Sequence, residues 1–164
     1  MKTAKIASGL AVIALTAGLS ACGSSSSKTT TTTAASGLSR AALATRADSI
    51  CATANAQLAA IKAPSGTAIA SDPVAAAGYF DKVFPIADAE TKAIQALVPA
   101  SNVAADWSAF VNAQVAADQL LQTVKQKADA KDPKGLKDLA NVKPAGQKVT
   151  DAANKIGAKT CAGR

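Results

Sequence analysis

Residues 39–62 read "SRAALATRADSICATANAQLAAIK", a stretch without proline or glycine whose apolar residues return every three or four positions. The recurring set is Leu43, Ala47, Ile50, Ala54, Leu58 and Ile61. This spacing puts the side chains on one face of an α-helix, because the helix completes a turn about every 3.6 residues. The stretch therefore predicts a long amphipathic helix, with Cys51 at the edge of its buried face.

Two dipeptides predict where later helices begin. Asp72–Pro73 and Asp132–Pro133 each pair an N-capping side chain with a proline at the first helical position. The second helix is expected to end before Pro99, and Ser101 or Asn102 is expected to cap the third. Four helices are therefore predicted along residues 38–164.

The apolar stripes of these three helices follow the same spacing. The second stripe is Phe80, Val83, Phe84, Ala87, Ile94 and Leu97. The third is Trp107, Phe110, Val111, Gln114, Ala117, Leu121, Val124 and Ala128. The fourth is Leu136, Leu139, Val142, Gly146, Val149, Ala153 and Ile156, followed by Gly157.

No segment alternates with period two for long enough to suggest a strand. The expected fold is all-α, an up-down-up-down four-helix bundle formed by one domain, residues 38–164. Pro85 and Pro144 fall inside the second and fourth helices and are expected to kink or break them. The many alanines are expected to bring the helices close together and to leave little room for a large cofactor; none is predicted.

The amino-terminal residues show the pattern of an export signal. "MKTAK" carries Lys2 and Lys5 without an acid, and an apolar run follows from Ile6 to Leu19. This run is shorter than the roughly 20 apolar residues of a membrane span and is interrupted by Ser, Thr and Gly. Residues 1–21 are therefore predicted to be a signal peptide.

The signal ends in Leu19-Ser20-Ala21-Cys22, which resembles the lipobox of bacterial lipoproteins. The resemblance implies that Cys22 carries a diacylglycerol, becomes the first mature residue and anchors the chain on the extracytoplasmic face of the cell membrane. The layout is also similar to that of small uncharacterised helical lipoproteins of high-GC Gram-positive bacteria. That similarity implies no activity.

Residues 22–37, rich in Ser and Thr after Cys22, contain no large apolar side chain. Such a segment cannot add to a core and is expected to be a flexible tether between the lipidated cysteine and the helices.

Cys51 and Cys161 remain as a pair once Cys22 is assigned to lipid. In an oxidising compartment a disulfide is the default expectation, and it would close a loop of about 110 residues. A redox or metal-binding pair is the alternative, but the chain has no CxxC and no histidine. Cys51 lies well inside its helix, so the bridge requires either that the first turns project beyond the bundle or that the fourth helix stops early.

The sequence gives little support to catalysis. Histidine, the commonest general base, is absent, and no phosphate-binding loop or nucleophile motif occurs. Asp81 and Asp88 could share a helix face, but with Lys82 and Lys92 nearby a solvated charged face is the expected reading. No catalytic residue, cofactor site or metal site is predicted, and the protein is expected not to be an enzyme.

Basic residues gather toward the carboxyl end of a chain whose net charge is +7. They are Lys125, Lys127, Lys131, Lys134, Lys137, Lys143, Lys148, Lys155, Lys159 and Arg164, against four acids. This excess could attract anionic lipid or acidic wall polymer, although a solvated polar face is the simpler explanation. Nucleic acid is not an expected partner, because no aromatic residues are interleaved with the charges.

Gln114 is the one polar residue of the third stripe. It is expected to be a buried amide bonded to a neighbour, with a place in a small ligand pocket as the alternative. Two functions remain: a non-catalytic binding or scaffolding module of the cell envelope, and a carrier that holds a small apolar or lipid ligand between its helices.

Overall fold

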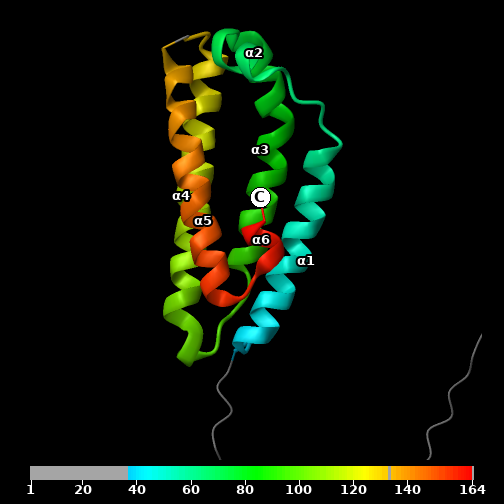
Figure 1. Ribbon diagram of the computed structural model, residues 1–164, viewed down its shortest axis with the longest axis vertical. Helices are drawn as coiled ribbons and strands as arrows, with labels where there is room; N and C mark the ends of the chain where they lie inside the picture. Colours follow the sequence, from blue (N-terminus) through cyan, green and yellow to red (C-terminus); the bar gives the residue numbers. More distant parts are fainter. Residues whose placement is uncertain (1–36, 133, 164) are drawn as a thin grey trace, which may run out of the picture. The chain divides into compact units, whose positions relative to one another are not determined.

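The computed structural model describes residues 37–132 and 134–163, and within them the protein is all-α, as predicted. Four long helices form the bundle: α1 (Arg40–Ala59), α3 (Pro73–Gln95), α4 (Ala104–Asp129) and α5 (Val142–Ile156) (Figure 1). The predicted signal peptide, the lipobox with Cys22 and the tether as far as residue 36 lie outside the described residues.

Capping side chains set the starts of two long helices where the sequence predicts them. The Ser39 hydroxyl accepts a hydrogen bond from the Ala42 amide at 3.3 Å, which begins α1. The Asp72 carboxylate accepts from the amides of Val74 and Ala75, and Pro73 is the first residue of α3. These bonds satisfy amides that have no partner within the helix.

A short helix that the sequence analysis missed lies between α1 and α3. This helix, α2 (Gly66–Ser71), begins where the Ser65 hydroxyl accepts from the Ala68 amide at 3.2 Å. It has too few residues to show a periodic stripe, and none of them is buried. The first helix, α1, also ends at Ala59, three residues before the predicted Lys62.

The predicted fourth helix is divided into three pieces. A 3₁₀ segment, η2 (Gly135–Asn141), precedes α5, and a short helix, α6 (Lys159–Ala162), follows it. Pro144 does not break α5 but is its third residue, where a missing amide hydrogen costs no intrahelical bond. Gly157, with φ of 85°, ends α5 in the left-handed conformation that glycine adopts easily.

Of the two effects predicted for Pro85, a kink or a break, the break does not occur, because α3 continues through this residue to Gln95. Pro85 is exposed. Packing of α3 against α1 and α4 on its other faces holds the helix together despite the lost hydrogen bond.

The buried side chains form two separate cores. The disulfide core comprises Leu43, Ala47, Cys51, Ile94, Ala100, Val103, Trp107, Phe110, Val149, Ala153, Ile156, Ala158 and Cys161. The second core, beside α2, comprises Ala76, Phe80, Val124, Ala128 and Leu136. Trp107 packs against Phe110 in the disulfide core, with ring centroids 5.5 Å apart, as expected of aromatics on a buried stripe.

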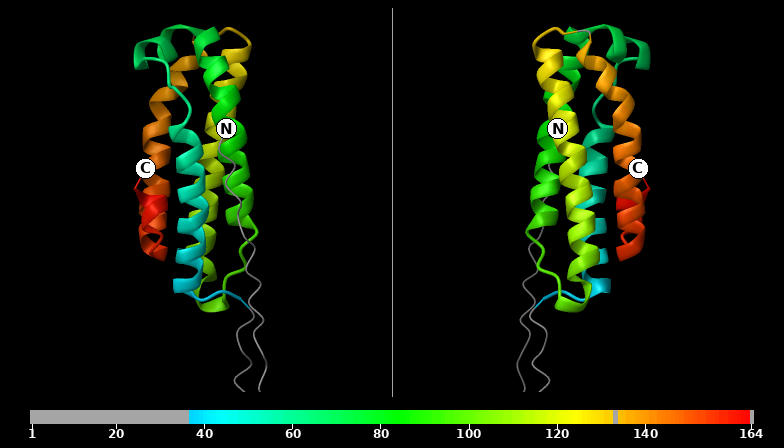
Figure 2. Two further views of the ribbon diagram at one scale, coloured as in Figure 1. Left: turned by 90° about the vertical axis from the view of Figure 1, so that its right-hand side faces the viewer. Right: turned by 90° about the vertical axis from the view of Figure 1, so that its left-hand side faces the viewer.

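The predicted bridge is present: Cys51 and Cys161 are bonded at 2.01 Å, with Cα atoms 5.3 Å apart. After Gly157 the chain reverses, and α6 returns to pack against the middle of α1 (Figure 2). The Asp48 carboxylate of α1 accepts hydrogen bonds from the amides of Thr160 (2.7 Å) and Cys161 (3.3 Å). The early end of the fourth helix thus brings Cys161 to a cysteine in mid-helix.

Leu38 joins the start of the domain to the connection between α3 and α4. Its amide donates to the Val98 carbonyl at 2.8 Å, and its carbonyl accepts from the Ala100 amide at 2.9 Å. Gly37 has φ of 153°, and a Cβ atom there would lie 2.4 Å from the Pro99 carbonyl oxygen. Glycine is therefore required at the last residue of the predicted tether.

Candidate functional site

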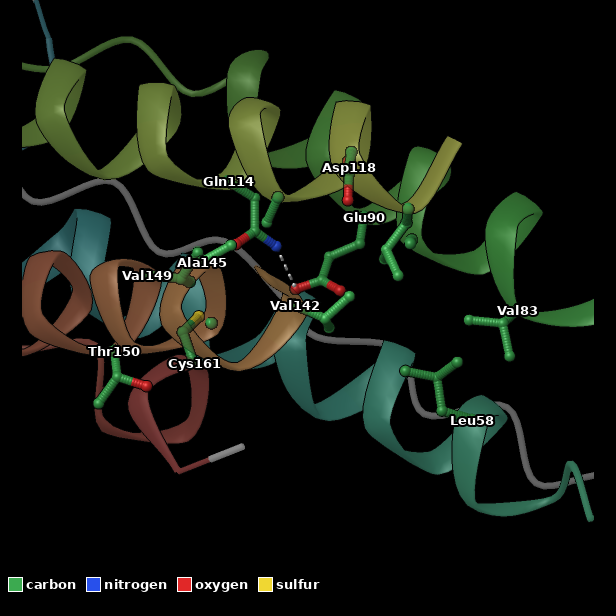
Figure 3. A pocket seen from close by; sticks show the side chains of 14 residues that line it. Leu58, Val83, Glu90, Gln114, Asp118, Val142, Ala145, Val149, Thr150 and Cys161 are labelled. Atoms are coloured by element: carbon green, nitrogen blue, oxygen red, sulfur yellow. Dashed lines mark hydrogen bonds between the residues drawn. The ribbon is translucent and has the colours of Figure 1, made fainter. Parts of the chain in front are cut away.

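A cavity of about 240 Å³ lies among the helices (Figure 3). Its lining comes mainly from α3, α4 and α5, with one residue each from α1 and α6. These residues are Leu58, Val83, Ala87, Glu90, Gln114, Ala117, Asp118, Leu121, Val142, Ala145, Gly146, Val149, Thr150 and Cys161. Leu121 also packs on the second core, and Val149 and Cys161 belong to the disulfide core, so the cavity separates the two.

Small residues keep this space open. Ala87, Ala117, Ala145 and Gly146 line the cavity where larger side chains fill the space elsewhere in the bundle. A Cβ atom built on Gly146 would meet no atom within 4 Å, and Gly146 is exposed, which places it at the opening. Alanines thus border open space here, whereas in the disulfide core they lie in close packing.

Glu90 is an acidic side chain buried at the cavity wall, with 3% of its surface exposed. Its Oε1 accepts a hydrogen bond from Gln114 Nε2 at 3.3 Å, drawn as the dashed line in Figure 3. The same oxygen lies 3.2 Å from Cys51 Sγ, but a disulfide sulfur has no hydrogen to donate. Glu90 therefore links α3 to α4 and touches the bridge.

Asp118 adds a second carboxyl group to the cavity. Burial raises its pKa from 3.8 to about 6; the nearby Thr91 hydroxyl lowers the pKa and the charge of Asp88 raises it. Thr91 Oγ1 is buried and makes no hydrogen bond within the described residues, so it acts on Asp118 as a neighbouring dipole. The Asp118 carboxyl is therefore ionised at neutral pH at a cost in stability.

The predicted charged residues on the outside of the helices form surface ion pairs. Asp88 pairs with Lys92 at 2.7 Å, and Asp81 pairs with Lys125 at 2.8 Å. Lys127 pairs with Asp138. Hydrogen bonds to Asp129 and Asp81 raise the pKa of Lys125, and one to Asp138 raises that of Lys127. Asp81 and Asp88 thus lie on a solvated charged face, as expected.

The structure brings Gln114 and Cys161 to one cavity, with Cys51 bonded to Cys161 behind the wall. Gln114 is a buried amide bonded to a neighbour, as expected, and it also lines the cavity, which agrees with the alternative of a place in a pocket. Glu90 and Asp118 are not among the residues predicted for a site. Their positions in the sequence could have indicated that they face the other helices. Glu90 falls on the second stripe between Ala87 and Ile94, and Asp118 lies one turn beyond Gln114.

Two further observations bear on function. Within residues 37–132 and 134–163, no group of three or more Cys, Asp or Glu side chains is placed to hold a metal ion. No helix in this same part of the chain is both long and apolar enough to cross a membrane.

Comparison of the chain with protein-family models, with curated proteins and with solved structures gives no match.

Proposed function

We propose that this protein is a membrane-anchored lipoprotein of the cell envelope whose helical domain binds a small, largely apolar molecule in the interhelical cavity, without catalysis. The cavity carries the proposal, because its walls are mostly aliphatic and it opens to solvent at Gly146. Concave sites with mostly apolar walls and a few polar groups that fix orientation are typical of ligand sites, and this cavity is at the small end of that class. The long helices would form an up-down-up-down scaffold around it.

The volume limits the size of the ligand. A cavity of about 150 Å³ holds one benzene molecule, so about 240 Å³ in proportion holds about ten non-hydrogen atoms. A diacyl lipid is several times larger. The cavity therefore favours a small molecule over a whole lipid as the occupant.

The anchor in this proposal is Cys22, whose lipid would hold the domain on the extracytoplasmic face of the cell membrane. The basic residues toward the carboxyl end could add attraction to anionic lipid or wall polymer. Lys125 and Lys127 contribute less, because both pair with carboxylates of the domain. Nucleic acid is not proposed as a partner.

Native mass spectrometry of the protein purified from the cells that produce it tests ligand binding. Gly146→Leu would place a side chain at the opening of the cavity, where a Cβ atom meets nothing within 4 Å. Gly78→Leu is the matched control, because Gly78 is also a helical glycine with open space and does not line this cavity. We expect an adduct on the wild type and on Gly78→Leu, and its loss from Gly146→Leu. Empty wild-type protein, or an adduct retained by Gly146→Leu, counts against the proposal.

Cys22→Ala tests the anchor separately. The variant should leave the membrane fraction and lose incorporation of labelled lipid, since Cys22 is the proposed attachment point. Membrane retention unchanged by the substitution, with no lipid label on the native protein, would refute it.

A further inference from the structure

We infer that the ligand of the cavity is a small neutral alcohol, whose hydroxyl donates a hydrogen bond to Gln114 Oε1 and whose apolar body lies against the aliphatic wall. This inference rests on the proposed function and names its ligand class. It follows from the orientation of the Gln114 side chain, the hydrogen bonds that the other polar groups already make, and the size of the space.

The two ends of the Gln114 amide have different surroundings. Its Nε2 donates to Glu90 Oε1 at 3.3 Å, and this bond fixes the amide orientation, because an amide oxygen has no hydrogen to give a carboxylate. Figure 3 shows the amide oxygen turned away from Glu90, to the side where Ala145 and Val149 lie in the view.

The amide oxygen of Gln114 is an acceptor without a partner. It makes no hydrogen bond within residues 37–132 and 134–163. In this part of the chain, Thr91 Oγ1 is the one side-chain oxygen or nitrogen that is both fully enclosed and unbonded. Gln114 Oε1 is therefore not fully enclosed, although the residue as a whole is 5% exposed, and it contacts the open space of the cavity.

The side-chain donors of the lining are already used. Gln114 Nε2 donates to Glu90, and the Thr150 hydroxyl donates to the Ala162 carbonyl at 3.2 Å. The described lining contains no lysine, arginine, tyrosine or tryptophan. A carboxylate or phosphate ligand would find no free side-chain donor here, whereas the hydroxyl of an alcohol needs an acceptor, which Gln114 Oε1 provides.

The position of the Asp118 carboxyl group disfavours a cationic ligand. The groups beside this carboxyl are the Thr91 hydroxyl and Asp88. Both residues line, with Asp118, a separate groove between α3 and α4, and neither lines the cavity. The charge of Asp118 thus belongs mainly to the groove, and an ammonium group in the cavity would bring three donors to a wall that is mostly aliphatic.

The aliphatic wall and the volume define the rest of the ligand. Figure 3 shows Val83 and Leu58 to one side of Gln114, where the wall is aliphatic. The space of about 240 Å³ holds about ten non-hydrogen atoms. A compact hydrocarbon group that carries one hydroxyl satisfies both limits.

Three probes of matched size separate the hydroxyl from the apolar body. Phenethyl alcohol, propylbenzene and phenethylamine share a phenyl ring and a two-carbon chain, and end in a hydroxyl, a methyl and an ammonium group. Each is titrated at neutral pH into the full-length protein in detergent, with the free probe measured by dialysis into buffer without micelles. We expect the amine to bind at least about tenfold more weakly than the alcohol, because its charge would lose water without a counter-charge.

Two variants locate the acceptor. Gln114→Met keeps the length of the side chain and removes Oε1, whereas Thr150→Val keeps the shape and removes the other neutral oxygen of the lining side chains. Gln114→Met should weaken binding of the alcohol about threefold to tenfold relative to propylbenzene, the amount that one neutral hydrogen bond contributes. Thr150→Val is the matched control and should leave this ratio within about twofold.

A second measurement needs no variant, because Gln114→Met also removes the hydrogen bond to Glu90. The nuclear magnetic resonance signal of the Gln114 side-chain carbonyl carbon is compared between the alcohol and propylbenzene complexes of the wild type. The alcohol should move this signal downfield relative to propylbenzene, since a hydrogen bond to the oxygen withdraws electron density from the carbon.

Four results overturn the inference: equal carbonyl signals in the two complexes, an affinity ratio unchanged in Gln114→Met, a ratio lost in Thr150→Val instead, or an amine that binds as tightly as the alcohol. The proposed function still stands in each case if propylbenzene binds and Gly146→Leu abolishes its binding. Failure of all three probes to bind overturns both. If Gln114→Met does not fold, the carbonyl signal decides the result.

Discussion

Helices α3, α4 and α5 contribute to both the disulfide core and the cavity, yet the core is filled and the cavity is open. Along α3, Ile94 is fully buried in the core, and one turn earlier Glu90 faces the cavity. Along α4, Phe110 fills the core, and one turn later Gln114 lines the cavity. The change from packed to open therefore occurs within a single turn of each helix.

This comparison shows what determines the cavity. Helix spacing is set by the large residues and the bridge of the disulfide core, and small or polar residues at the next level do not fill the space that remains. Such a gap costs stability, because its lining atoms lose van der Waals contacts and buried carboxyls lose water. Each of the following changes tests one side of this contrast.

The largest effect is expected from removing the bridge. The double variant Cys51→Ala, Cys161→Ala should lower the free energy of unfolding by about 4 kcal/mol, because the bridge restricts a loop of 110 residues in the unfolded chain. Urea unfolding of the variant and of oxidised and reduced wild type gives the value. A loss below about 1 kcal/mol would show that helix packing alone positions the disulfide core.

Truncation should cost more in the core than at the cavity. Phe110→Ala should lower the free energy of unfolding by about 3 to 5 kcal/mol, since Phe110 is fully buried. Leu121→Ala should cost about 1 to 2 kcal/mol, because Leu121 is partly buried and already borders open space. Urea unfolding compares the two, and equal losses would contradict the contrast.

Asp118→Asn should stabilise the protein at neutral pH. The folded pKa of about 6 exceeds the ordinary 3.8, so the folded protein holds its proton more tightly, and wild-type stability falls as pH rises from about 4 to about 6. After allowance for partial exposure, the gain at neutral pH is about 1 kcal/mol. No gain is expected below pH about 4.

Unfolding curves across this pH range check the prediction. Asp129→Asn is the control, because Asp129 is exposed and paired with Lys125, and it should give no gain at neutral pH. Equal pH profiles for wild type and Asp118→Asn would contradict burial of this carboxyl group.

The sequence predicts much of the fold. Periodic spacing predicts four long helices, and the side chains of Ser39 and Asp72 cap α1 and α3 because capping is a local interaction. The expected caps at Ser101 or Asn102 and at Asp132 do not begin α4 or α5, whose N-cap residues Val103 and Asn141 make no side-chain hydrogen bond. Two of the features that the sequence does not predict have clear physical causes. Residues 66–71 are too short to show a period, and the reversal at Gly157 follows from packing of α6 on α1, a contact distant in sequence.

The candidate site is less predictable. Gln114 stands out as a polar residue on an apolar stripe, but Glu90 sits in a gap of its stripe that a solvated residue could also occupy. A cavity is a property of several helices together, because its volume depends on how far apart the disulfide core holds them. No single helix of the sequence contains that information.

The most direct test adds the same side chain at two positions on α5. Gly146 and Ala153 lie two turns apart on one face, the first at the cavity opening and the second fully buried in the disulfide core. The measurement is the free energy of unfolding of Gly146→Leu and Ala153→Leu relative to wild type. We predict that Gly146→Leu is neutral or gains about 0.5 to 1 kcal/mol, because helical glycine is replaced and open space is filled, and that Ala153→Leu loses about 1 to 3 kcal/mol through overpacking. Similar losses at both positions would contradict the claim that the bundle is open at one level and closed at the next.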